Sequence, residues 1–165
     1  STTATIVIDG LDFGDLPDNN VNTTSSGNYQ TLFSSNNAIS GPYHTIANPN
    51  TLRMGANVDA ENDGLQSALA TGDDTNSTPD DEDGIATFPT FIPGQNATVS
   101  VSLTNTTGGN ANLYGFIDWN NDGDFGDTGE APAAVTILNN ATTANITFSV
   151  PSNAVQGVNV GARFR

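Results

Sequence analysis

The sequence predicts an all-β domain, an antiparallel β-sandwich with a long loop-rich N-terminal half. Two observations support this class. From residue 84 onward, short segments alternate between apolar and polar residues, which is the pattern of half-buried strands. Residues 19–58 are instead rich in Asn, Ser and Thr and show no helical period. At 165 residues the chain has the length of a single domain.

The clearest predicted strand spans residues 98–103, where Val99, Val101 and Leu103 share one face and Ser100 and Ser102 share the other. Further strands are predicted at residues 5–8, 113–118, 134–138, 144–150 and 158–165. Turn residues separate them at 108–110, 139–140 and 151–153. Short strands with turns at this spacing are typical of a small sandwich.

The first half reads as turns and long loops. Residues 9–18 are turn-rich, residues 65–69 have room for a single helical turn, and Tyr29, Phe33 and Tyr43 are candidate aromatic anchors. Long ordered loops are uncommon unless something pins them. We therefore expect one domain, 1–165, in which a loop-rich part (1–83) packs on a sandwich (84–165), as a monomeric module within a longer chain.

The charge balance excludes several partners. The chain has 18 Asp and Glu against 3 Lys and Arg, giving a net charge of −15. Nucleic acid and anionic membrane surfaces would be repelled by this charge. There is no cysteine, which rules out disulfides and thiolate metal sites. No apolar run approaches the length of a membrane span, so we expect no membrane insertion.

All the acidic residues fall into four loop clusters, and the predicted strands from residue 98 onward have only Asp118, at the end of one of them. The clusters are Asp9, Asp12, Asp15 and Asp18; Asp59, Glu61 and Asp63; Asp73, Asp74, Asp80, Asp81, Glu82 and Asp83; and Asp118, Asp122, Asp124, Asp127 and Glu130. A surface that is acidic for solubility would scatter these charges. Carboxylates this close together repel each other, and oxygen-only ligands on loops suit calcium. We therefore predict that several Ca²⁺ ions stabilise the sandwich.

The strongest motif is DWNNDGDF at residues 118–125. Its oxygen ligands at loop positions one, three and five, followed by Gly123, match the start of an EF-hand calcium loop. Glu130 falls at position thirteen, one residue beyond the usual bidentate Glu, and the preceding segment reads as a strand. The alternative is an Asx-rich hairpin turn.

DAENDG at residues 59–64 repeats the same spacing, and an acidic turn is again the alternative. The predicted metal ligands are Asp12, Asp15, Asp59, Glu61, Asp63, Asp73, Asp74, Asp80, Asp81, Asp83, Asp118, Asn120, Asp122, Asp124 and Glu130.

Catalysis is disfavoured. His44 is the one histidine, and neither a His-Glu-x-x-His zinc site nor a Gly-x-Ser-x-Gly elbow occurs. A Ser-His-Asp triad needs only proximity in space, so the sequence leaves that possibility open. Carboxylates that hold calcium make poor general acids, because a nearby cation lowers their pKa. We expect a protein that is not an enzyme.

Several segments together resemble the GEVED-type modules of large secreted bacterial surface proteins. They are DFGDLPD (12–18), GPYH (41–44), MGANVDAE (54–61), GDD (72–74), DDEDGI (80–85) and YGFIDWN (114–120). The likeness is greatest to the peptide-binding domain of giant RTX adhesins. The segment GEAP at 129–132 only partly keeps the motif that names the family.

The resemblance implies a calcium-dependent module, secreted to the bacterial surface, that attaches to another cell by gripping exposed peptide or protein ends. It implies calcium ligation by the acidic residues of these segments. For the peptide we consider Arg53, with Tyr43 and His44 as a wall; the alternative is that Arg53 pairs with a neighbour. Two other functions stay open: a spacer stiffened by calcium, and a calcium lectin, although no Glu-Pro-Asn or Gln-Pro-Asp signature occurs.

Overall fold

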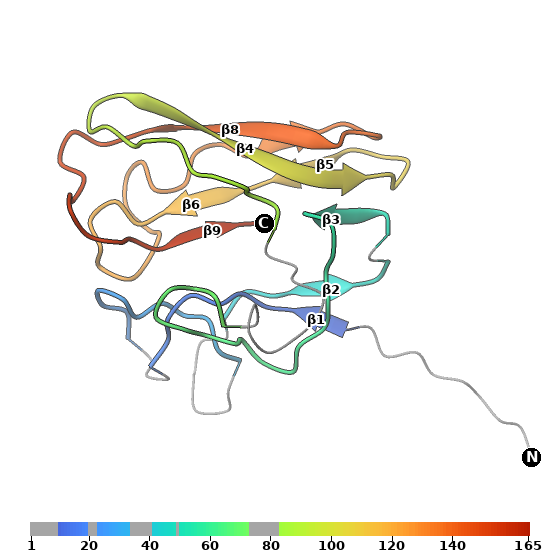
Figure 1. The fold of residues 1–165 in the computed structure, drawn as a ribbon, viewed down its shortest axis with the longest axis horizontal. Helices are drawn as coiled ribbons and strands as arrows, with labels where there is room; N and C mark the ends of the chain where they lie inside the picture. The colour runs from blue at the N-terminus through green and yellow to red at the C-terminus, as the bar shows by residue number, and fades with distance from the viewer. Residues whose placement is uncertain (1–9, 20–22, 34–40, 49, 73–82) are drawn as a thin grey trace, which may run out of the picture.

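The computed structural model describes residues 10–19, 23–33, 41–48, 50–72 and 83–165 (Figure 1). These residues contain strands and no helix, which confirms the all-β prediction. The strands are β1 (Gly10–Asp12), β2 (His44–Ile46), β3 (Leu52–Met54), β4 (Asn96–Asn105), β5 (Ala111–Leu113), β6 (Gly115–Ile117), β7 (Val135–Ile137), β8 (Thr143–Ser149) and β9 (Ala162–Phe164). The strand predicted at residues 5–8 lies outside the described residues.

Every strand pair is antiparallel. A three-stranded sheet has the order β3-β4-β8, and three two-stranded sheets pair β1 with β2, β5 with β7, and β6 with β9. β3 comes from the first half of the chain, and its Leu52 lies opposite Asn105 of β4. The main sheet is therefore completed at one edge by the part of the sequence that reads as loops.

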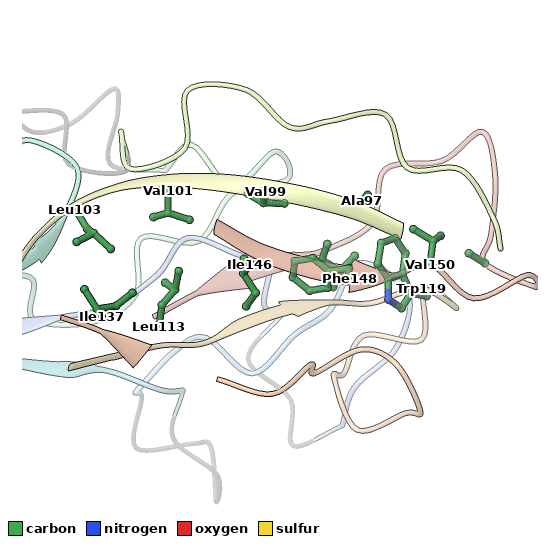
Figure 2. Close-up of a cluster of buried hydrophobic side chains, with 12 residues drawn as sticks. Ala97, Val99, Val101, Leu103, Leu113, Trp119, Ile137, Ile146, Phe148 and Val150 are labelled. Carbon is green, nitrogen blue, oxygen red and sulfur yellow. The ribbon is translucent and has the colours of Figure 1, made fainter. Parts of the chain in front are cut away.

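The hydrophobic core lies between β4–β8 and the strands β5, β6 and β7 (Figure 2). Along β4 every second residue from Ala97 to Asn105 is buried, which confirms the predicted alternation. Figure 2 shows Val101 and Leu103 of β4 facing Leu113 of β5 and Ile137 of β7. At one end of the core, Trp119 packs edge-on against Phe148 with ring centres 6.1 Å apart.

Three predicted segments differ in detail. The strand expected at 113–118 is split at Tyr114, because β5 pairs with β7 whereas β6 pairs with β9. Only Ala162–Phe164 of the last predicted segment is a strand. The turn-rich segment 9–18 contains β1, which pairs with β2, and Leu11 also bridges to Glu61. In each of these segments the strand boundaries are set by pairing with residues distant in the sequence, which a local sequence pattern does not reveal.

In Figure 1 the loops of the first half lie below β6 and β9, at about the level of β1 and β2. Residues 65–69 form no helix; Ala70 N donates to Ser67 O across 3.2 Å in a simple turn. Among the residues that the structure describes, no helix is long and apolar enough to cross a bilayer.

Candidate functional site

The 118–130 loop follows β6 and begins with a buried carboxylate. Asp118 is 0% exposed. Its Oδ2 accepts hydrogen bonds from Gly123 N at 2.9 Å and from Tyr29 Oη at 2.8 Å, and its Oδ1 accepts Asp122 N at 3.2 Å. A buried carboxylate without such donors would be strongly destabilising. These donors therefore fix where the loop begins and turns.

Tyr29 connects the first half of the chain to this loop. Its hydroxyl donates to Asp118 and accepts from Gly161 N at 2.8 Å, while Asp118 N donates to Gly161 O at 3.0 Å. Burial and the bond to Asp118 raise the pKa of the Tyr29 hydroxyl. The ring also stacks on Phe125 at 5.5 Å. One side chain thus holds three segments in contact.

The middle of the loop is organised by side chains that accept backbone hydrogen bonds. Asp122 Oδ1 accepts Asp124 N at 3.2 Å, and Asn120 Nδ2 donates to Asp122 Oδ2 at 3.0 Å and to Asp127 Oδ2 at 2.7 Å. Gly123 has a φ of +93°, and a Cβ there would lie 2.0 Å from Ser25 O. The glycine is required both by its left-handed backbone and by this close approach.

Glu130 closes the loop. It is 1% exposed; its Oε1 accepts Trp119 N at 2.9 Å and its Oε2 accepts Asp127 N at 3.0 Å. Burial raises the pKa of this carboxyl, while the two amide bonds oppose the rise. In an EF-hand the last Glu ligates the ion through both oxygens. Here both oxygens bind backbone amides, so Glu130 holds the two ends of the loop together.

Asp59 and Glu61 form a second acidic group beside β1. Glu61 Oε2 accepts Phe13 N at 2.9 Å, but its Oε1 is buried and accepts no N–H or O–H bond from the described residues. Burial, followed by the neighbouring carboxyl groups of Asp59 and Asp12, raises the pKa of Glu61 to about 8. The Glu61 carboxyl therefore favours a bound proton or a nearby cation.

The other acidic side chains join loop segments far apart in sequence. Each accepts backbone N–H bonds, in place of the ladders that secondary structure would supply. The pairs are Asp15 with Gly72 at 2.6 Å, Asp18 with Thr31 and Leu32 at 2.9 Å each, Asp63 with Phe33, and Asp83 with Ala56 at 2.8 Å. Asp63 also accepts the adjacent Gly64 N at 2.9 Å. Asp18, absent from the predicted ligands, is 4% exposed.

The structure brings together part of the predicted ligand set. One group comprises Asp118, Asn120, Asp122, Asp124 and Glu130 along one loop, and another Asp12, Asp59 and Glu61. Asp15, Asp63 and Asp83 each bind other loop segments, whereas Asp73, Asp74, Asp80 and Asp81 lie outside the described residues. Within the described ranges no three His, Asp or Glu side chains are already grouped as a metal site. The donors are nevertheless all oxygen, as calcium prefers, and the buried Oε1 of Glu61 fits a cation.

The predicted ligand contacts are found at two places. Arg165 Nη2 donates to Tyr43 O at 3.2 Å and lies 3.5 Å from His44 Nε2. Burial and the Arg165 charge lower the pKa of His44. Arg53, on β3, donates from Nε to Ala56 O at 2.9 Å. The arginine beside Tyr43 and His44 is therefore Arg165, and not the predicted Arg53.

Arg163 is a second arginine that sequence reasoning missed. Its Nη2 donates to Gln30 O at 3.1 Å, and its guanidinium lies 5.3 Å from the centre of the Phe125 ring. Burial lowers its pKa to about 10. It lines a cavity of about 90 Å³ with Tyr29 and Asp124. No local motif marks it, because its hydrogen-bond partner Gln30 lies more than a hundred residues away in the sequence.

Comparison with protein families gives one match: residues 112–165 match the GEVED domain. The matched residues include β6 to β9 and the whole 118–130 loop. This supports the GEVED-type module suggested by the sequence. Comparison with curated proteins and with solved structures found no significant match.

Replacing Tyr29 by Phe tests the connection between the halves. The change removes the hydroxyl and leaves the buried Asp118 carboxylate and the Gly161 N–H each short of a partner. We expect a loss of about 1–3 kcal/mol in unfolding free energy, measured by denaturant titration. Tyr114→Phe is the matched control, because that residue is 45% exposed. Equal stability of the two variants would contradict the role assigned to Tyr29.

Proposed function

We propose that this chain is a calcium-dependent adhesion module of a large secreted bacterial surface protein, and that it binds exposed peptide or protein ends on a target cell. The GEVED match supports the module type. The observation that carries the proposal is the 118–130 loop, in which a buried Asp118 anchors a turn whose Asp122, Asp124 and Asp127 side chains are at least partly exposed. The likeness to RTX adhesins and the location at the bacterial surface belong to the same proposal.

Calcium stabilisation of a β-sandwich is part of this proposal. The core between β4–β8 and the strands facing it is the packing expected of a sandwich. Asp122 and Asp124 are the side chains of the 118–130 loop best placed for an ion, since Asp118 and Glu130 are buried on internal donors. Asp59 and Glu61 would hold a second ion, for which Glu61 offers its buried Oε1. When bound, calcium supplies the positive charge that the chain itself lacks.

Peptide recognition is supported by the first half of the molecule. Phe33 and Tyr43 are exposed by 44% and 41%, and their rings pack edge to face 5.7 Å apart. Arg165 lies at the backbone of Tyr43 and could pair with a peptide carboxylate. Arg53 is the other candidate partner for that carboxylate. An exposed aromatic pair beside an arginine suits a peptide end, with apolar contact and charge in one place.

A spacer stiffened by calcium is the second candidate. It is favoured by the many acidic side chains that already hold loop segments together, since an ion at such sites would strengthen the domain without any ligand. A calcium lectin is the third candidate, and no contact in the described residues favours it.

Calcium titration of single variants tests the metal proposal. Asp122→Asn should weaken calcium binding by about tenfold or more, because a neutral amide replaces a charged ligand. Asp127→Asn is the matched control. Asp127 lies in the same loop and is not among the predicted ligands, and the substitution removes the same charge. Isothermal titration calorimetry of both variants separates ligation from net charge. Equal affinities in the two variants would contradict the assignment of Asp122.

A binding screen tests the ligand class. The intact domain, in calcium, is applied to a library of peptides with free C-termini and to a glycan array, each repeated with excess chelator. We expect calcium-dependent binding to peptides, weakened in Arg165→Ala or Arg53→Ala. Binding to glycans alone would support the lectin, and binding to neither would support the spacer.

A further inference from the structure

Within the described part of the chain, the outer edge of β8 carries backbone groups that have no hydrogen-bond partner. β4 is the only strand paired with β8 among the described strands. Val150 N donates to Gln95 O at 2.9 Å and Leu103 N donates to Thr142 O at 3.0 Å. In an antiparallel ladder hydrogen-bonded pairs alternate with non-bonded ones. The even-numbered residues of β8 therefore bond to β4, and the N–H and C=O groups of Thr143, Asn145 and Thr147 point away from it.

The opposite edge of this sheet is occupied. β3 pairs with the end of β4, and beyond it Ser102 N donates to Gly84 O at 2.8 Å while Gly55 N donates to Ser102 O at 2.9 Å. On the β8 side no backbone hydrogen bond between described residues involves the outward groups of Thr143, Asn145 or Thr147. The end of this edge at Ser149 lies near Gly129. As far as the described residues show, the free part of this edge is therefore the stretch before Ser149.

β8 also lacks the features that usually protect a strand edge. Proteins protect such edges with charges, proline, bulges or very short strands. β8 has seven residues with the sequence TANITFS, which contains no charge, proline or glycine. The side chains of Thr143, Asn145 and Thr147 are also exposed. An edge of this kind is a template for another strand.

The distribution of charge favours a second copy of this chain as the source of the strand that pairs with β8. With a net charge of −15, most approaches between two copies of this chain are repulsive. Residues 131–165 contain no Asp or Glu, so β8 offers a place where two copies can meet at little electrostatic cost. Two β8 strands in antiparallel register are self-complementary, as a two-fold interface requires.

We propose that a second copy of this chain pairs with β8 across its free edge, antiparallel, and continues the β3-β4-β8 sheet into the partner. The outward groups of Thr143, Asn145 and Thr147 then bond to the same strand of the other copy. This interface goes beyond the proposed adhesion function and replaces the expectation of a monomer. The proposed self-association surface is distinct from the side chains of the 118–130 loop that are assigned to calcium.

Sedimentation velocity over a range of concentrations tests the interface. The wild-type mass should rise from 17.0 kDa toward twice that value as concentration increases, and added NaCl should strengthen the association by screening repulsion. Thr147→Pro removes an outward N–H without breaking the β4–β8 ladder and should stay monomeric. Thr98→Pro is the matched control: Thr98 lies opposite Thr147, and its N–H points to the other edge. Circular dichroism checks that both variants fold.

Amide hydrogen exchange of the wild-type chain gives a second readout that needs no variant. At high protein concentration the amides of Asn145 and Thr147 should exchange more slowly than at low concentration, by about tenfold or more, because pairing protects them. The amides of Thr98 and Ser100, on the opposite edge, should not change. A monomer at every concentration, equal association of the two proline variants, or exchange independent of concentration would overturn the proposal.

Discussion

The contact on which the rest of the structure depends is the buried carboxylate of Asp118. Its hydrogen bonds from Tyr29 and Gly123 join a loop of the first half, the turn of the 118–130 loop and, through Tyr29, the backbone of Gly161 just before β9. The sheets of the second half are held by an apolar core. The first half has few strands to hold it, and side-chain carboxylates bonded to distant amides take their place. Without the donors Tyr29 and Gly123, the buried Asp118 carboxylate would lose its hydrogen bonds. The Tyr29 segment of the first half is therefore tied closely to the second half.

The same chemistry accounts for the unusual charge of the chain. A carboxylate that accepts one amide hydrogen bond still has lone pairs directed elsewhere. Backbone donors therefore orient these groups without neutralising them, and three arginines cannot supply the missing charge. Glu61 shows the consequence most clearly, since its buried Oε1 and its raised pKa indicate a position that favours positive charge. Calcium would neutralise the carboxylates that the backbone donors have already oriented. Calcium binding would thereby stabilise the first half of the chain, which also carries the proposed recognition surface.

The sequence was most informative where local periodicity dominates. The alternation along β4 and the turn at Gly123 were both predicted from residue type and spacing, whereas the burial of Asp118 was not. It was least informative where long-range pairing decides. Nothing local distinguishes β5 from β6, marks Tyr29 as the partner of Asp118, or places Arg165 beside Tyr43. Glu130 was chosen as a ligand by its spacing, whereas its contacts show a residue that closes the loop; its part in calcium binding stays a prediction.

Thermal unfolding of the intact domain with and without calcium tests the account most directly. Each ion bound only by the folded state adds about 2.7 kcal/mol at a concentration a hundredfold above its dissociation constant. The account predicts that excess chelator lowers the melting temperature strongly, and that amides of residues 10–19, 23–33, 41–48 and 50–72 lose exchange protection before those of β4 and β8. Magnesium at the same concentration should restore little of the loss. An unchanged melting curve and unchanged protection after chelation would contradict it.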